Sequence, residues 1–309
     1  MAVNFEIADS KDWDALVSES PHSTPFHEFT WGETIAEQFQ AVFKPFIAIE
    51  ADRQWLVPAY QNLPGQSVGI KVGSIGYGGP LPDRQVIDGE DELKKSILIL
   101  EALAKTVGAS SLQATLYPAE FWSEHSAPDE VSFGSTCKVA LAGDEQSVFD
   151  GTLTSTVRRA IRKSEKSDVV VRELRVGDEE DEETSLALLH KTQEEVGSDY
   201  LTQGTLLDAI NKLDQLNLTG KTFVAEVDAE TAGMVTCVYD KNELFHLFHG
   251  WDRSYADSRV NQALIWTMIR HAIDRSIPSF NMGESHTSGI REAKLRWGGH
   301  MESVPRIRL

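Results

Sequence analysis

The order of secondary-structure elements repeats once along the chain, and this repeat constrains the fold more than any other feature. In each half, hydrophobic periodicity predicts a strand, two helices, three strands, a long helix, a strand, a short helix and a final strand. No strong residue-level repeat accompanies it, so the repetition is one of architecture. The 309 residues divide near 143–152 into two predicted domains, 1–147 and 148–309. Each has an ordinary domain size of about 150 residues.

The boundaries of the predicted elements follow from apolar spacing and from turn residues. In the first half we expect helices at 11–19, 28–39, 90–107 and 119–125, and strands at 4–7, 46–50, 55–61, 68–74, 111–117 and 132–141. In the second half we expect helices at 182–196, 204–216, 258–275 and 290–297, and strands at 169–174, 222–227, 232–239, 243–250, 279–282 and 303–308. Asp257 or Ser258 is the expected cap of the longest helix.

These elements predict a mixed α/β (α+β) fold. The three strands between 222 and 250 are joined by short turns, which favour an antiparallel meander. Each domain is therefore expected to contain a mixed, mostly antiparallel sheet flanked by helices.

Charge and composition exclude several classes of protein. The net charge of −19 disfavours nucleic acid as a general partner, so DNA is not expected and tRNA is disfavoured. Residues 151–309 carry 20 Lys/Arg against 25 Asp/Glu, whereas residues 1–150 carry 9 against 23, so a phosphorylated ligand is expected in the second half. Two isolated cysteines give no zinc spacing, and no metal is expected. Without a signal peptide or a membrane-length apolar run, we expect a cytoplasmic protein.

Motifs near the C-terminus resemble those of a known family. The sequence runs through Phe248-His249-Gly250-Trp251, Asn261 and Phe280-Asn281-Met282-Gly283-Glu284-Ser285, then Gly289, Lys294 and Trp297-Gly298-Gly299. This run resembles the FemAB pattern of a strand ending in Phe-Asp-Phe-Gly-x-Ser, followed by a Gly and Lys-x-x-Trp-Gly. FemAB-like proteins associated with exosortase systems carry a similar run.

The repeat and the motifs together resemble the FemAB-like branch of the GNAT acyltransferases. The basic segment Thr156–Lys166 is similar to the helix that opens the second FemAB domain. The resemblance implies two tandem GNAT-like domains and transfer of an acyl or aminoacyl group. Two departures stand out. Asn281 replaces the usual Asp, and the GNAT pyrophosphate loop is absent from Asp252–Val260.

A basic helix supplies the first candidate site. Its cations lie on two neighbouring rows at i, i+4 spacing, which suit phosphate groups: Arg158 and Arg162 with Lys166, and Arg159 with Lys163. A solvated helix face is the alternative interpretation.

The segment 283–294 supplies the second. The resemblance implies that Lys294 neutralises a substrate phosphate, and Arg291 lies one turn earlier on the same side. His286 is a candidate general base, and Glu284 another if burial raises its pKa. Ser285 is a candidate substrate ligand. Alternatively, the loop hydroxyls only cap the next helix, with Ser288 as its cap.

Strand 243–250 and the start of the long helix complete the set. His246 and His249 are expected on opposite faces under strand alternation, and His249 is the candidate for proton transfer. Asn261 is expected near an anion held by free helix amides. The alternatives are a satisfied core histidine and local hydrogen bonding near the helix cap.

The resulting hypothesis is an acyltransferase without a covalent intermediate. An amine or hydroxyl acceptor would attack acyl-CoA, with acetyl-CoA as the simplest donor, assisted by a general base and by backbone amides. The expected site is the cleft between the domains, and the acceptor is a small molecule or a cell-envelope precursor. Two alternatives remain: a FemAB-type aminoacyltransferase that uses aminoacyl-tRNA, and a GNAT-like binding module without catalysis.

Overall fold

The computed structural model describes residues 3–61, 69–73, 75–125, 127–197, 202–215 and 218–309. The chain forms two compact units. Unit 1 contains residues 1–136 and 301–309, and unit 2 contains residues 137–300. These units differ from the predicted domains at both ends, because the chain enters unit 2 within one long strand and its last strand returns to unit 1.

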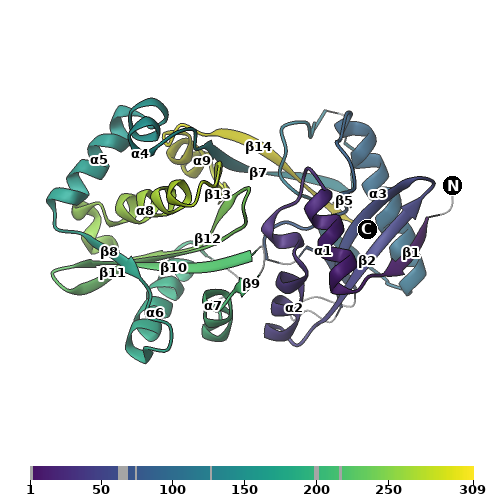
Figure 1. Ribbon diagram of the computed structural model, residues 1–309, viewed down its shortest axis with the longest axis horizontal. Coiled ribbons are helices and arrows are strands. Elements are labelled where there is room, and N and C mark those ends of the chain that lie inside the picture. The colour runs from purple at the N-terminus through teal and green to yellow at the C-terminus, as the bar shows by residue number, and fades with distance from the viewer. Residues whose placement is uncertain (1–2, 62–68, 74, 126, 198–201, 216–217) are drawn as a thin grey trace. The chain divides into compact units, whose positions relative to one another are not determined.

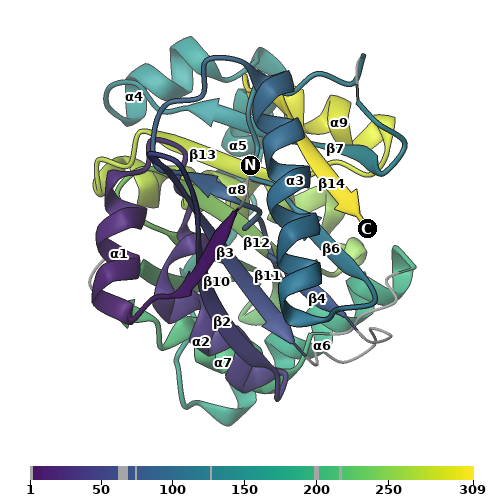
Figure 2. The same ribbon diagram turned by 90° about the vertical axis from the view of Figure 1, so that its right-hand side faces the viewer.

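Unit 1 is a mixed sheet with helices on both faces. Its strands follow the order β1-β2-β3-β4-β6-β14, and β5 pairs with β3. The long helix crosses one face and the two N-terminal helices cover the other (Figures 1 and 2). The elements are β1 (Asn4–Ile7), α1 (Ser10–Glu19), η1 (Pro25–His27), α2 (Phe29–Gln38), β2 (Val42–Glu50), β3 (Arg53–Gln61), β4 (Ile70–Val72), β5 (Leu81–Pro82), α3 (Gly89–Val107), β6 (Leu112–Thr115), β7 (Val131–Ala140) and β14 (His300–Arg308).

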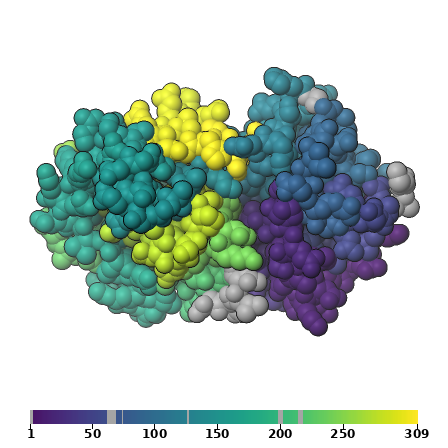
Figure 3. Space-filling model, turned by 45° about the horizontal axis from the view of Figure 1, so that its top comes forward, coloured from purple at the N-terminus to yellow at the C-terminus, as the bar shows by residue number. Residues whose placement is uncertain are grey.

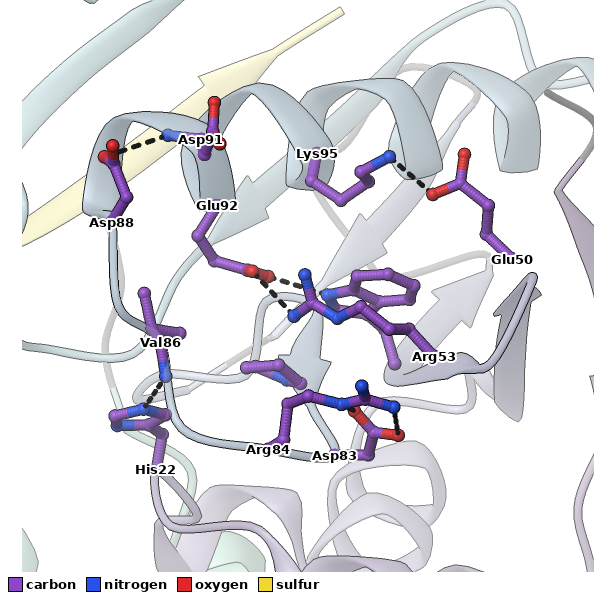
Figure 4. Close-up of polar contacts among 12 residues, drawn as sticks. His22, Glu50, Arg53, Asp83, Arg84, Val86, Asp88, Asp91, Glu92 and Lys95 are labelled. Carbon is purple, nitrogen blue, oxygen red and sulfur yellow. Dashed lines mark hydrogen bonds and ion pairs between the residues drawn. The ribbon is translucent and has the colours of Figure 1, made fainter.

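A buried carboxylate fastens α3 to β3 in unit 1. Glu92 is 3% exposed, and it accepts hydrogen bonds from Trp55 Nε1 at 2.6 Å and from Arg53 Nη2 at 3.0 Å. The Arg53 guanidinium also lies 4.4 Å from the centre of the Trp55 ring. Figure 4 shows this cluster beside the Lys95–Glu50 pair. The charges are matched locally, as a buried carboxylate requires.

Unit 2 repeats the arrangement. Its strands follow the order β7-β13-β12-β11-β10-β8, and β9 pairs with β10. Helices α5 and α8 lie over one face, and α6 and α7 lie over the other (Figure 1). The elements are α4 (Glu145–Ser147), η2 (Val148–Thr152), α5 (Ser155–Lys166), β8 (Val170–Glu173), α6 (Glu179–Glu195), α7 (Gly204–Asn211), β9 (Asp214–Gln215), β10 (Leu218–Val227), β11 (Glu230–Tyr239), β12 (Leu244–Trp251), η3 (Arg253–Ser258), α8 (Val260–Asp274), β13 (Ser279–Glu284) and α9 (Ser288–Leu295).

The predicted fold class is confirmed. Both units carry a mostly antiparallel sheet, and β10, β11 and β12 form the predicted meander. Each unit also contains one parallel pair formed after its long helix, β4 with β6 and β12 with β13. Helices of this kind connect parallel neighbours because the chain must cross back over the sheet.

Three local predictions are wrong. Residues 119–125 form no helix, because Ala119 exchanges two backbone hydrogen bonds of 3.1 Å with Ser303. Helix α7 ends at Asn211, before a short strand that pairs with β10. The cap of α8 is Arg259, with φ +62° and no side-chain capping bond, instead of Asp257 or Ser258. Val68, Ser74 and Leu216, which bound two predicted elements, lie outside the described residues.

Candidate active site

A cavity of about 770 Å³ opens inside unit 2, where two parallel strands diverge. Strands β12 and β13 are in register only at Leu244–Phe280 and Phe245–Asn281. Beyond these pairs, both strands contribute to the wall of the cavity, together with α5, α9 and the start of α8. The backbone at the diverging ends is therefore placed beside the cavity, where a ligand can reach it.

A β-bulge places two histidines in this cavity. The register between β11 and β12 shifts after Thr236–Phe248, so that Cys237 pairs with His246 and Leu247 is skipped. A bulge adds one residue to one strand and changes which face the following side chains occupy. His246 and His249 therefore share a face, with ring centres 5.2 Å apart, and both line the cavity. The prediction of opposite faces is wrong for this reason.

Both histidines are held neutral. Burial lowers the pKa of His249 to about 4, and the positive charge of Lys294 lowers it further. Burial, His249 and Lys294 together hold the pKa of His246 well below its usual value. Among the described residues, neither Nε2 atom has a hydrogen-bond partner. At neutral pH the cavity thus carries two uncharged imidazoles.

Lys294 reaches the same cavity from α9. Its Nζ donates to the carbonyl of Gly283 at 2.8 Å and to the carbonyl of Glu284 at 2.6 Å. Burial lowers the pKa of Lys294 to about 8, which the nearby Glu284 partly counters. This ammonium is therefore engaged with the backbone at the end of β13.

Only one row of the basic helix faces the cavity. Arg159 and Lys163 line it, and the Lys163 ammonium lies 3.9 Å from the Asp257 carboxylate. The cavity lining includes neither Arg158, whose guanidinium donates to the carbonyl of Asp150, nor Arg162, which lies over the Phe149 ring at 5.1 Å. The structure thus brings together two of the four predicted α5 cations.

The loop after β13 is divided in the same way. Glu284 lines the cavity. The His286 side chain is 72% exposed, with Nδ1 lying 3.9 Å from Glu284 Oε2. Ser285 Oγ is buried and has no hydrogen-bond partner within the described parts of the chain. Arg291 is exposed and lies outside the lining, and Thr287 instead of Ser288 caps α9.

Asn261 and Asn281 have different roles. Asn261 lines the cavity, and its Oδ1 atom is buried without a partner among the residues that the structure describes. Asn281 is fully buried, and its Oδ1 accepts from the Gly283 amide at 2.9 Å, where Gly283 has φ +72°. The amide oxygen supports this turn as a carboxylate oxygen would, so the replacement of Asp by Asn retains the acceptor.

Two further cations were not predicted as ligands. Arg259 and Arg296 both line the cavity. Arg259 lies within the segment where the GNAT pyrophosphate loop is absent, and it occupies the left-handed region that favours glycine. Its place in that segment was the available signal. For Arg296, which follows α9, the sequence offered none.

Two searches of the described residues returned nothing. No group of three or more His, Cys, Asp or Glu in those ranges is placed to hold a metal ion. Within the same ranges, no helix is both long and apolar enough to cross a membrane.

Comparisons with known proteins agree with this geometry. Residues 153–289 match the model of the acetyltransferase (GNAT) domain. The crystal structure of FemX resembles the chain with a TM-score of 0.66 at 11% identity, covering 98% of this chain and 96% of FemX. A tandem GNAT protein from the clavulanic acid biosynthesis pathway gives 0.52 at 12%, covering 99% and 98%.

A third structure is the N-myristoyltransferase of Saccharomyces cerevisiae with bound myristoyl-CoA. Its TM-score is 0.54 at 11% identity, covering 100% of this chain and 82% of that one. No curated protein sequence matches. Identities this low establish a shared fold and leave the substrates to be argued from the site.

Proposed function

Because this chain carries a GNAT-superfamily acetyltransferase domain on a FemAB-like fold, we propose that it transfers an acyl group from acyl-CoA to an amine or hydroxyl acceptor. The observation that carries the proposal is the divergence of β12 from β13 at the 770 Å³ cavity. Diverging strands leave backbone N–H and C=O groups unpaired by the sheet, and an extended amide-containing chain such as pantetheine can bond to such groups.

The charges around the cavity support an anionic donor. Arg159 and Lys163 on α5, with Arg259 before α8, line a cavity within a strongly acidic protein. Guanidinium and ammonium groups are the side chains that bind phosphate oxygens best. A diphosphate would lie among these side chains, with Asn261 and the first amides of α8 close by.

The reaction would proceed by direct attack. The acceptor nitrogen or oxygen forms a bond to the thioester carbonyl carbon, the bond from that carbon to sulfur breaks, and the departing thiolate takes up a proton. A base must remove the acceptor proton. Glu284 lines the cavity, and His286 lies beside it to pass the proton to solvent. His249 is held neutral and accepts a proton poorly, because the pKa of its imidazole is about 4.

The acceptor is proposed from fold likeness alone. We assign a small molecule or a cell-envelope precursor, because the fold is that of FemX. The same likeness supports aminoacyl-tRNA as the alternative donor, against which stands the net charge of −19.

Calorimetry with acetyl-CoA, CoA and charged tRNA distinguishes these functions. We expect CoA and acetyl-CoA to bind in the micromolar range and charged tRNA not to bind at moderate salt. Binding of charged tRNA alone would establish the aminoacyltransferase. Absence of binding by all three would leave the non-catalytic module.

A further inference from the structure

The ammonium of Lys294 joins α9 to the diverging end of β13. Its two acceptors, the carbonyls of Gly283 and Glu284, follow the last β13 residue that is in register with β12. Backbone at this point receives no further pairing from β12. The contacts therefore hold β13 where the sheet no longer does.

Helix α9 is itself fixed to the basic helix. Thr154, the cap of α5, donates to the Arg296 carbonyl from Oγ1 at 2.7 Å and from its amide at 3.3 Å. Figure 3 shows the yellow residues of α9 beside the teal residues of α5. A continuous path of contacts thus runs from α5 through α9 and Lys294 to β13.

We propose that Lys294 is a positioning residue that keeps the end of β13 apart from β12, and that it does not bind the phosphates of the donor. The inference about position needs only the contacts within unit 2. The inference about phosphate rests on the proposed acyl-CoA function.

The chemistry of the ammonium supports this assignment. A lysine ammonium has three N–H donors, and two of them are directed to carbonyls. Burial at this position disfavours the charged form and lowers the pKa to about 8, which a phosphate ligand does not require. Lys163 has a 48% exposed side chain in the same cavity and is free of such backbone contacts among the described residues.

Hydrogen exchange of the unliganded protein tests the positioning role. We expect amides of residues 279–287 to exchange about tenfold faster in Lys294→Met, because two charge-assisted hydrogen bonds are lost. Lys294→Arg should restore most of the protection. Lys163→Met is the matched control, with exchange in this segment equal to that of the wild type. Wild-type protection in Lys294→Met would overturn the proposal.

Titration with CoA over a range of salt concentrations tests the second half. Salt screens contacts between exposed cations and phosphate. Lys163→Met should therefore lose part of the salt dependence of the dissociation constant. Lys294→Met should bind about tenfold more weakly with the salt dependence of the wild type. An equal loss of salt dependence in both variants would make Lys294 a phosphate ligand and overturn the inference.

The two proposals fail separately. If wild-type protein does not bind CoA, the acyl-CoA function fails, whereas the exchange experiment still decides the role of Lys294. Should Lys294→Met not fold, exchange is measured in Lys294→Gln, whose shorter side chain cannot reach both carbonyls. Wild-type protection in that variant also contradicts the positioning role.

Discussion

At the scale of single residues, burial decides which candidates can do chemistry. His249 and His286 both satisfy the sequence requirement for a base, yet His249 is neutral in a cavity and His286 is mostly in solvent. Glu284 is the candidate that combines a position in the cavity with a carboxylate. Sequence spacing identified all three residues, but it carries no information on solvation.

Burial of His249 makes the protein sensitive to acid. The folded pKa of about 4 lies below the 6.5 of an exposed imidazole, so only the unfolded chain takes up this proton as the pH falls through 6.5. The stabilisation is complete above pH 6.5 and is lost between 6.5 and 4. We expect His249→Gln to lose about 1 to 3 kcal/mol less free energy of unfolding over that interval.

Urea denaturation at several pH values measures this effect. His286→Gln is the control, because its exposed side chain should leave the pH dependence of the wild type unchanged. Identical curves for His249→Gln and the wild type would contradict the buried neutral state.

At the scale of elements, α9 depends on close backbone approach. Gly298 has φ +83°, and a Cβ atom there would lie 2.0 Å from the Thr152 carbonyl oxygen. Gly289 lies in α9, and a Cβ atom there would meet nothing within 4 Å. The two glycines therefore respond differently to the same substitution.

We expect Gly298→Ala to lower the free energy of unfolding by about 2 to 4 kcal/mol, since it combines a left-handed backbone with a steric clash. Gly289→Ala should be neutral or slightly stabilising, because alanine favours the helix. Thermal and urea denaturation of both variants provide the measurement. Equal stability of the two variants would show that α9 does not pack closely on residue 152.

At the scale of the whole molecule, the two units repeat a layout but not a site. In unit 1 the parallel pair β4 and β6 is followed by a bridging contact, in which the Gly78 amide donates to the Thr115 carbonyl at 3.1 Å. The long helix α3 also begins with Glu90, Asp91 and Glu92, which oppose phosphate. In unit 2 the corresponding strands diverge at a cavity with cations.

One donor molecule per chain is therefore the expected stoichiometry. Calorimetric titration with CoA should give a binding ratio near one, and Lys163→Ala should weaken that single event. A ratio near two would show that unit 1 also binds the donor despite its acidic helix.

Much of this fold could be predicted from the sequence. The repeated order of elements, the meander and the long helices follow from local periodicity, because helix and strand spacing are properties of neighbouring residues. The failure at 119–125 has a non-local cause, since Ala119 pairs with Ser303. Tertiary pairing overrides local propensity in such segments.

The candidate site divides along the same line. By itself the sequence determined the types of group present, namely the cations of α5, the loop after β13 and the histidines of β12, because motifs and spacing are local. Only the tertiary structure decided that Arg159 and Lys163 face the cavity, that a skipped Leu247 brings the histidines together, and that Lys294 binds backbone carbonyls. These outcomes depend on strand register and on packing between distant segments, which no local pattern specifies.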